Sequence, residues 1–410
     1  MVLKQYKIAM LSVHSCPVGN PGTKDTGGMS VYILELVQEL AAQGISVDIY
    51  TRVHNPEDAQ IIELGQDVRL IHLRAGEDNY IHKLAVYSYL PDFACNVENF
   101  RKCNDLRYDL VFSHYWLSGW AGKYLSQWWN VPHVMMFHTL GVVKNRVGIG
   151  EDEPELRLKT EGLLARDCHL IIATTEKEKE ELIQNYGASP GRISIIPCGV
   201  NLKLFQPMDK KIAKQQLDFD EDKIILFVGR IELLKGIDQL MQAISYLKNS
   251  HRLRLVIVGD VEDGQYGMGR LQQLSQDLHI EDLVTFSGLI KHEELKHFYN
   301  AADVCVIPSY YESFGLVALE SMACGTPVVT TNVGDLKNII QQGETGYVVM
   351  DHTPSVFANK IDLLLLKPGS DAKYALSIRA SVTRFSWSNI AREIVRVFQE
   401  VVANYSAQAC

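Results

Sequence analysis

The chain has 410 residues, of which 47% are hydrophobic, and its formal net charge at pH 7 is −9. This length can supply the cores of two or three domains, and the acidic balance offers no overall basic field for nucleic acid or anionic lipid. No apolar run is long enough to cross a bilayer and no signal-peptide pattern is present, so we expect a cytoplasmic protein. The eight cysteines form no C-x-x-C pair and are predicted to be reduced thiols, and no zinc motif or P-loop appears.

Short apolar runs of strand length alternate with helical patterns from the start of the chain. The expected strands of the first half are residues 7–13, 46–51, 68–73, 109–114, 133–137, 170–175 and 193–197, and its expected helices include 29–42 and 84–101. Continuous apolar strands between helices indicate a parallel sheet covered on both faces. The alternation stops in a connector at residues 197–211, which contains Pro and Lys. We therefore place a domain boundary there, with domains at residues 1–200 and 201–386.

A second series of the same kind follows the connector. Its expected strands are residues 223–230, 252–260, 283–288, 304–309 and 327–331, and its expected helices are 236–249, 267–277, 292–302 and 314–324. Two such series predict an α/β protein with two doubly wound, Rossmann-like domains, and the ligand site is expected in the cleft between them. A final amphipathic segment at 387–405 predicts a helix within residues 387–410 that joins the first domain.

A glycine pair, Gly27 and Gly28, precedes the first helix soon after the first strand. A strand, a glycine-containing loop and a helix expose backbone N–H groups to an anion, most often a phosphate. The spacing from Gly19 and Gly22 does not fit the nicotinamide fingerprint G-x-G-x-x-G, and the second strand does not end on an acidic residue, so a nicotinamide oxidoreductase is disfavoured. The glycines alone are equally compatible with a surface loop.

Two cations follow the first strand of the second series. Arg230 and Lys235 stand in the segment VGRIELLKG, just before an expected helix. An Arg that binds bidentately and a Lys that acts as a point charge suit a diphosphate. Taken alone, they are more typical of a solvated connecting loop.

Two carboxylates, Glu312 and Glu320, are separated by seven residues. If one helix covers the whole span, they lie about 12 Å apart along its axis. This exceeds the roughly 5 to 9.5 Å of a glycoside hydrolase pair. The spacing favours the two ends of an elongated ligand, with one carboxylate on sugar hydroxyls and the other on ribose hydroxyls. The N–H groups from Ser313 to Leu316 would then face the phosphate between them.

The motifs D-x-G-G-M, V-G-R-x4-K-G and E-x7-E, in this order, resemble those of the retaining GT-B glycosyltransferases of family 4. The resemblance covers essentially the whole chain and implies two Rossmann-like domains facing across a cleft. GTKDTGGMSVYILEL, SHYWLSGW and FHTLGVVKN are most similar to the mycothiol-pathway branch, which transfers N-acetylglucosamine to inositol phosphate. Sucrose-phosphate synthases are a weaker likeness, because they usually have Gln where this chain has Met29.

The resemblance implies roles for individual residues. The implied catalytic residues are His138, Glu312, Arg230 and Lys235. The implied donor-binding residues are Gly28, Arg230, Lys235, Glu312, Ser313, Phe314, Gly315, Leu316 and Glu320, with Glu320 on the ribose. The implied acceptor-phosphate residues are Lys83, Tyr115, Thr139 and Arg157. Without the resemblance, His138 would be interpreted as a hydrogen-bonded core histidine and Lys83 as a surface lysine. Ser30 departs from the Asn of the mycothiol-pathway branch, so a different acceptor polyol is left open.

The resemblance further implies retention at the anomeric carbon and a nucleotide sugar as substrate, with UDP-linked glucose or N-acetylglucosamine expected. The small phosphorylated acceptor is expected to be inositol phosphate. No cofactor is predicted and no metal is expected to be essential. The alternatives are transfer to fructose 6-phosphate, transfer to a lipid or polysaccharide, a nucleotide-sugar epimerase and a non-catalytic nucleotide-sugar-binding protein. No nucleic-acid partner and no integral membrane segment are expected, and homodimer formation is left open.

Overall fold

The computed structural model describes residues 6–19, 27–79, 81–219, 222–248, 252–259, 267–366 and 372–409. These residues divide into two compact units. The first holds residues 6–19, 27–197 and 387–409, and the second holds residues 198–386. The division at Pro197 falls inside the connector, and the last helix belongs to the first unit.

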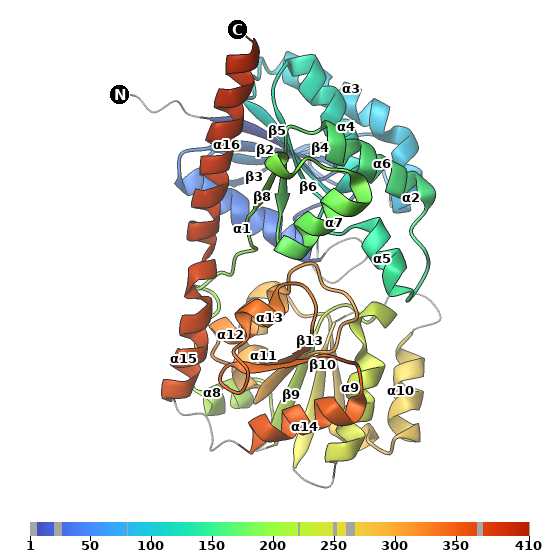
Figure 1. Ribbon diagram of the computed structural model, residues 1–410, viewed down its shortest axis with the longest axis vertical. Coiled ribbons are helices and arrows are strands. Elements are labelled where there is room, and N and C mark those ends of the chain that lie inside the picture. Colours follow the sequence, from blue (N-terminus) through green and yellow to red (C-terminus); the bar gives the residue numbers. More distant parts are fainter. Residues whose placement is uncertain are drawn as a thin grey trace. The chain divides into compact units, whose positions relative to one another are not determined.

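The first unit is built on a sheet that has eight strands in the described residues, in the order β3-β4-β2-β1-β5-β6-β7-β8 (Figure 1). The strands are β1 (Lys7–Leu11), β2 (Ser46–Arg52), β3 (Ile61–Gly65), β4 (Val68–Leu73), β5 (Leu110–His114), β6 (His133–Met136), β7 (Leu170–Ala173) and β8 (Ile193–Ile195). All pairs are parallel except β3 with β4. The predicted parallel sheet is therefore confirmed, with one antiparallel edge strand added.

Helices cover both faces of this sheet, as a doubly wound fold requires. They are α1 (Gly28–Ala42), α2 (Lys83–Val86), α3 (Leu90–Cys103), α4 (Tyr115–Trp129), α5 (Gly141–Val147), α6 (Glu155–Asp167), α7 (Glu176–Tyr186) and α16 (Trp387–Ala409), with 3₁₀ turns η1 (Tyr87–Tyr89) and η2 (Pro190–Arg192). Figure 1 shows α1 and α16 on one side of the sheet and α3, α4 and α6 on the other. The rings of Tyr32 and Trp387, 5.1 Å apart, join α1 to α16. Completely buried Ala9 and Leu11 of β1 pack in the core on the α3 and α4 side.

The second unit has a sheet that is parallel throughout its described strands, in the order β11-β10-β9-β12-β13-β14. The strands are β9 (Lys223–Val228), β10 (Leu253–Val258), β11 (Val284–Gly288), β12 (Val304–Ile307), β13 (Val328–Thr331) and β14 (Gly346–Val349). Completely buried Ile225 of β9 and Leu255 of β10 pack in one core with Ile244 and Phe357 of the covering helices. The predicted fold class, two doubly wound α/β domains, is confirmed.

The helices of the second unit are α8 (Lys210–Gln216), α9 (Ile237–Leu247), α10 (Met268–Asp277), α11 (Leu295–Ala301), α12 (Leu316–Ala323), α13 (Leu336–Ile339), α14 (Pro354–Leu365) and α15 (Ala372–Val382), with 3₁₀ turns η3 (Leu233–Lys235), η4 (Glu281–Leu283), η5 (His292–Glu294) and η6 (Thr383–Phe385). Because α12 begins at Leu316, Glu312 stands in the loop before the helix. The distance derived for a fully helical span between Glu312 and Glu320 therefore does not apply.

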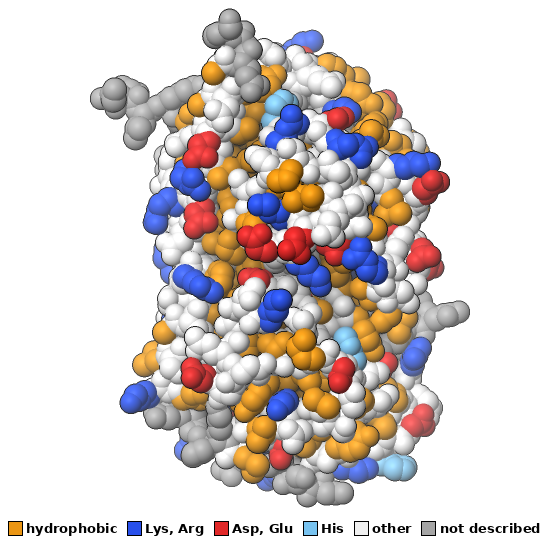
Figure 2. Space-filling model, viewed as in Figure 1, with side chains coloured by type: hydrophobic (Ala, Val, Ile, Leu, Met, Phe, Trp, Pro, Cys, Tyr) orange, Lys and Arg blue, Asp and Glu red, His pale blue; other side chains and the backbone are white. Residues whose placement is uncertain are grey.

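On the face drawn in Figure 2, basic and acidic side chains are interspersed. In the described part of the chain no helix combines the length and the apolar character that crossing a membrane would require. All seven cysteines in that part are free thiols, and four of them are buried.

Candidate active site

Three of the four residues predicted to bind the acceptor are in contact in the first unit. Arg157 on α6 donates from Nη2 to the backbone oxygen of Thr139 at 3.0 Å and to its Oγ1 at 2.9 Å. The same guanidinium lies over the ring of Tyr115, 4.9 Å from its centroid. Tyr115 follows β5 and Thr139 follows β6, and these strands are parallel neighbours. The three residues thus gather where ligands of such sheets bind, at the carboxyl ends of the strands.

The backbone is strained at two predicted site residues. Tyr115 has φ +74° and His138 has φ +61°, a left-handed conformation that residues other than glycine seldom adopt. Such strain costs roughly 1–3 kcal/mol per residue and is found mostly at functional sites. His138 Nε2 lies 2.8 Å from Nδ1 of buried His114. Burial lowers the pKa of His138 to about 3, so its imidazole is neutral near pH 7.

Arg157 is nearly inaccessible, with 1% of its surface exposed. It forms ion pairs with two carboxylates, from Nη1 to Glu153 Oε1 at 2.8 Å and from Nε to Glu161 Oε1 at 2.7 Å. Burial opposes its charge, but Tyr115 and the two glutamates together raise the pKa of Arg157 above its ordinary value. The guanidinium is therefore charged and already paired with two carboxylates.

Lys83, the fourth predicted acceptor residue, is the first residue of α2. No hydrogen bond or ion pair joins it to the other three in the described residues. Its charge nevertheless contributes to lowering the pKa values of His14 and Glu153. The His14 ring lies against that of Tyr115 in a tilted arrangement, with centroids 4.4 Å apart. Burial first, then His54, Lys83 and other neighbouring charges, lower the pKa of His14 to about 3. Neutral His14 is thus part of the same neighbourhood, although it was not predicted.

Gly28, predicted to approach the donor phosphate, is the first residue of α1 and is exposed. The preceding Gly27 is the N-cap, and no side chain in the described residues caps this helix. Gly22 and Asp25 lie outside the described residues. Ser30, two residues after Gly28, is buried, and its Oγ lies 3.1 Å from Ser15 Oγ.

In the second unit, two residues that are predicted to bind the sugar donor and are distant in sequence lie in contact. Lys235 Nζ donates to Glu312 Oε1 at 2.6 Å, and Ser309 Oγ donates to the same oxygen at 2.8 Å. The Lys235 and Glu312 side chains are 19% and 20% exposed. The cation predicted for the diphosphate is therefore in direct contact with the carboxylate predicted for the donor sugar.

Arg230 follows β9 and the left-handed Gly229, in the same loop as Lys235. Its Nη2 lies 3.3 Å from Glu232 Oε1, and its side chain is 38% exposed. Both cations therefore stand at the carboxyl end of β9. This strand lies between β10 and β12 in the sheet.

The loop before α12 contains the remaining predicted donor residues. Gly315, the N-cap of α12, has φ +111°, and a Cβ there would lie 2.6 Å from Leu336 Cδ2, so only glycine fits. Phe314 is buried and contacts Phe385, whereas Ser313 and Leu316 are half-buried. Leu316 starts α12, so the first N–H groups of the helix lie beside Glu312 in the chain.

Glu320, predicted to bind ribose, is 6% exposed on α12. One carboxylate oxygen lies 2.7 Å from His292 Nε2, and the other accepts from the Tyr299 hydroxyl at 2.7 Å. Each oxygen still has a lone pair, but the carboxylate is held in place from within the second unit. No direct contact between Glu320 and Glu312 is present in the described residues.

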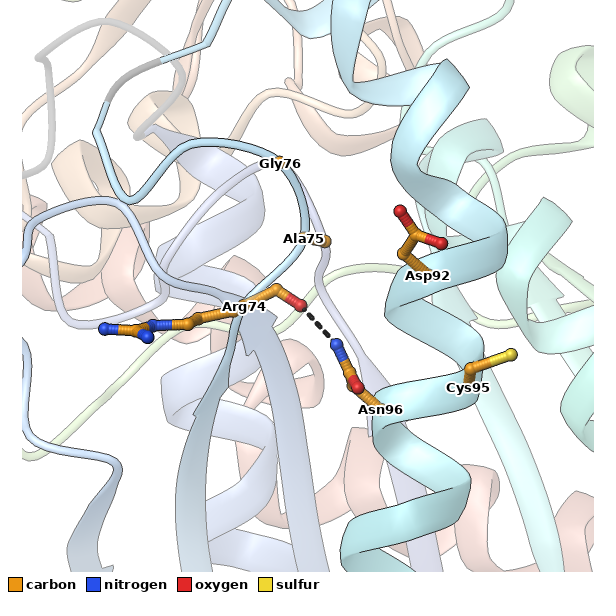
Figure 3. A pocket seen from close by; sticks show the side chains of 6 residues that line it. All are labelled: Arg74, Ala75, Gly76, Asp92, Cys95 and Asn96. Atoms are coloured by element: carbon orange, nitrogen blue, oxygen red, sulfur yellow. Dashed lines mark hydrogen bonds between the residues drawn. The ribbon is translucent and has the colours of Figure 1, made fainter.

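A small pocket of about 240 Å³ lies elsewhere in the first unit, between the end of β4 and α3 (Figure 3). Its lining residues are Arg74, Ala75, Gly76, Asp92, Cys95 and Asn96. The Asn96 amide donates to the backbone oxygen of Arg74 at 2.8 Å, as the dashed line shows. None of the predicted site residues lines this pocket.

Known proteins resemble this chain along its whole length. The family models described as "Glycosyltransferase Family 4" and "Glycosyl transferases group 1" match residues 26–204 and 208–380. D-inositol 3-phosphate glycosyltransferase 2 of Catenulispora acidiphila is 38% identical over 98% of this chain and 96% of its own. D-inositol 3-phosphate glycosyltransferase of Nocardiopsis dassonvillei is 36% identical over 97% of this chain and 95% of its own. The chain belongs to glycosyltransferase family 4.

The family 4 fold is also found in a solved relative. The structure of sucrose-phosphate synthase from Thermosynechococcus elongatus is 35% identical, covers 98% of this chain and all of its own, and superposes with a TM-score of 0.89. The predicted family, its fold and the glycosyltransferase class are thereby confirmed.

The glycosyltransferase contains an ionic network around Arg157 that sequence reasoning missed. Glu161 Oε2 accepts from the Gly141 backbone N–H at 2.9 Å and from the Tyr186 hydroxyl. Glu153 also accepts from Lys144. Glu153 and Glu161 stand four residues before and four residues after Arg157. This spacing could have indicated the two ion pairs from the sequence.

Proposed function

We propose that this glycosyltransferase moves a hexosyl group, N-acetylglucosamine or glucose, from a UDP-linked sugar to a hydroxyl of a small phosphorylated acceptor such as inositol phosphate. The observation that supports the acceptor part of this proposal is that Tyr115 and Thr139 both contact the charged guanidinium of Arg157. The relatives named D-inositol 3-phosphate glycosyltransferase, 36% and 38% identical, support the same kind of acceptor.

The donor half rests on the second unit. A diphosphate leaving group gains negative charge as the glycosidic bond breaks, so Arg230 and Lys235 lower the barrier by holding that charge. Glu312 accepts from the hydroxyls of the donor sugar, and Glu320 from the ribose. The reaction retains the anomeric configuration: the acceptor hydroxyl attacks from the side of the leaving group, whose phosphate takes its proton. The cations supply the charge that a metal ion would otherwise supply, so we expect transfer without added metal.

Transfer to fructose 6-phosphate is the second candidate function. The sucrose-phosphate synthase structure is 35% identical over nearly the whole chain, so the identities do not separate the two acceptors. Ser30, buried beside Ser15, stands where the resemblance to the inositol-phosphate branch leads us to expect Asn. Both candidates require a phosphate on the acceptor, and the polyol bound to it distinguishes them.

A substrate panel tests the proposal. The purified protein is given UDP-N-acetylglucosamine, UDP-glucose or GDP-mannose, each with inositol phosphate, fructose 6-phosphate or the unphosphorylated polyol, with EDTA present. We expect mass spectrometry to find a glycosylated phosphate ester from a UDP-sugar, and proton NMR to show an α-linkage. Transfer only to unphosphorylated acceptors contradicts the acceptor assignment. Donor consumption in the absence of any acceptor indicates an epimerase or hydrolase instead.

A further inference from the structure

Glu153 lies close to several cations near the predicted acceptor-binding residues. Its Oε1 accepts from Arg157 Nη1 at 2.8 Å and from Lys144 Nζ. Although burial opposes its charge, Arg157, then Lys144 and Lys83, lower the pKa of Glu153 to about 2. Three cations, two of them predicted to bind the acceptor phosphate, therefore act on one carboxylate.

The other carboxylate on Arg157 is held quite differently. Glu161 is completely buried in the middle of α6, and both of its oxygens are used, by Arg157 on one side and by the Gly141 N–H and Tyr186 hydroxyl on the other. A Cβ on Gly141 would come within 3.2 Å of Glu161 Oε2, which shows how closely the two pack. Glu161 is thus bound into three elements and has no room to leave.

Glu153 is attached less firmly. It precedes α6 in the segment after α5, where Gly148 and Gly150 have φ values of +66° and +85° and a Cβ on either would touch nothing within 4 Å. Its backbone is tied to Asn145, but its side chain has only the two cations as partners in the described residues. Glu153 is also buried, at 7% exposed, but moving its carboxylate breaks only these two ion pairs and no hydrogen bond to a backbone group or hydroxyl in the described residues.

We propose that Glu153 is an internal substitute for the acceptor phosphate: its carboxylate occupies the cations in the free protein and is exchanged for the phosphate when the acceptor binds, while Glu161 keeps Arg157 in place. This rests on the proposed function. A phosphate monoester carries up to two charges and three acceptor oxygens, so it can satisfy Arg157, Lys144 and Lys83 more fully than one carboxylate does. The exchange also avoids leaving a buried guanidinium unpaired.

The two carboxylates then have opposite effects on phosphate binding. In Glu153→Gln the competitor is neutral, so we expect inorganic phosphate and inositol phosphate to bind about fivefold more tightly than to the wild type. In Glu161→Gln the amide cannot accept from both sides, Arg157 loses its orientation, and both ligands bind about fivefold more weakly. The measurement is titration calorimetry at low ionic strength, with phosphate-dependent melting temperatures as a second readout if a variant is less stable.

Glu155→Gln is the matched control, because Glu155 is two residues after Glu153, at the start of α6, and in the described residues its ion pair is with exposed Lys159. It should bind phosphate as the wild type does. Binding by Glu153→Gln that is equal to or weaker than the wild type overturns the exchange. The acceptor assignment is tested separately by Arg157→Met: if wild-type protein binds no phosphate, or if Arg157→Met binds it equally well, the proposed acceptor site fails and the exchange fails with it.

Discussion

Lys235→Ala is expected to lower kcat/KM by about 10²–10³-fold or more while the protein stays folded. The ammonium is the point charge proposed to neutralise the departing diphosphate together with Arg230, and alanine at position 235 carries no charge. Its present partner, Glu312, is 20% exposed and keeps the Ser309 hydroxyl as a donor, so the loss of the pair leaves no deeply buried charge. Rates with the UDP-sugar found in the substrate panel, together with circular dichroism and the melting temperature, measure the effect.

The control for this variant is Lys337→Ala, because Lys337 is an exposed lysine of the same unit on α13. Its rate should be unchanged. Normal turnover by a folded Lys235→Ala protein would contradict the proposed donor site. Glu312→Ala and Arg230→Ala should show losses of similar size. Because Lys235 and Glu312 are in contact, their double variant should lose less than the product of the two single losses.

The alternation of apolar runs and helical patterns was sufficient to predict the two sheets. Strands such as 110–114 and 304–307 are buried on both faces, so they appear in the sequence as short, mostly apolar runs. Strand β3 was missed because it lies at an edge and alternates between exposed and half-buried residues. Its antiparallel pairing with β4 depends on a turn at residues 66–67, which the apolar pattern does not show.

The sequence predicted the residues of the candidate site but not the contacts between them. Motif spacing identified Lys235 and Glu312, yet their ion pair arises from the fold, across 77 positions of sequence. The left-handed backbone of Tyr115 and His138 could not be predicted, because residue type argues against it and tertiary packing imposes it. Similarly, the hydrogen bond from the Tyr186 hydroxyl to Glu161 forms only because α6 and α7 pack together.

The buried histidines of the first unit should make it sensitive to mild acid. His114 and His133 are both buried, and His133 Nε2 lies 2.8 Å from the Ser113 hydroxyl. Burial first, and then neighbouring His138, lowers the pKa of His114 well below its ordinary value. Burial first, then His169 and Lys123, lowers the pKa of His133 to about 3. The folded unit therefore takes up no proton on these two rings at pH values where the unfolded chain does.

The sign of the effect follows from proton linkage. Above a pH of about 6.5 both states are neutral at these histidines and the full stability is present. As the pH falls from about 6.5 toward 3, the unfolded state binds more protons, so each histidine lowers the free energy of unfolding by up to about 1.4 kcal/mol per pH unit. These two histidines should therefore remove about 3 kcal/mol between pH 7.5 and 5.5, in addition to the loss from buried His14 and His138, whose pKa values are also lowered to about 3. Glu153, whose folded pKa is about 2, contributes stability that is fully present above the ordinary pKa of a glutamate and is lost only as the pH falls below it, so its contribution stays constant between pH 7.5 and 5.5.

Urea unfolding followed by tryptophan fluorescence measures this loss in the first unit, because all five tryptophans, Trp116, Trp120, Trp128, Trp129 and Trp387, belong to it. His133→Gln can keep an acceptor toward the Ser113 hydroxyl but does not titrate, so the fall in stability between pH 7.5 and 5.5 should shrink by about 1.4 kcal/mol. His279→Gln, which changes an exposed histidine of the second unit, should leave the fall unchanged. A first unit that is equally stable at both pH values would mean that His114 and His133 titrate normally when folded, and hence that water reaches them.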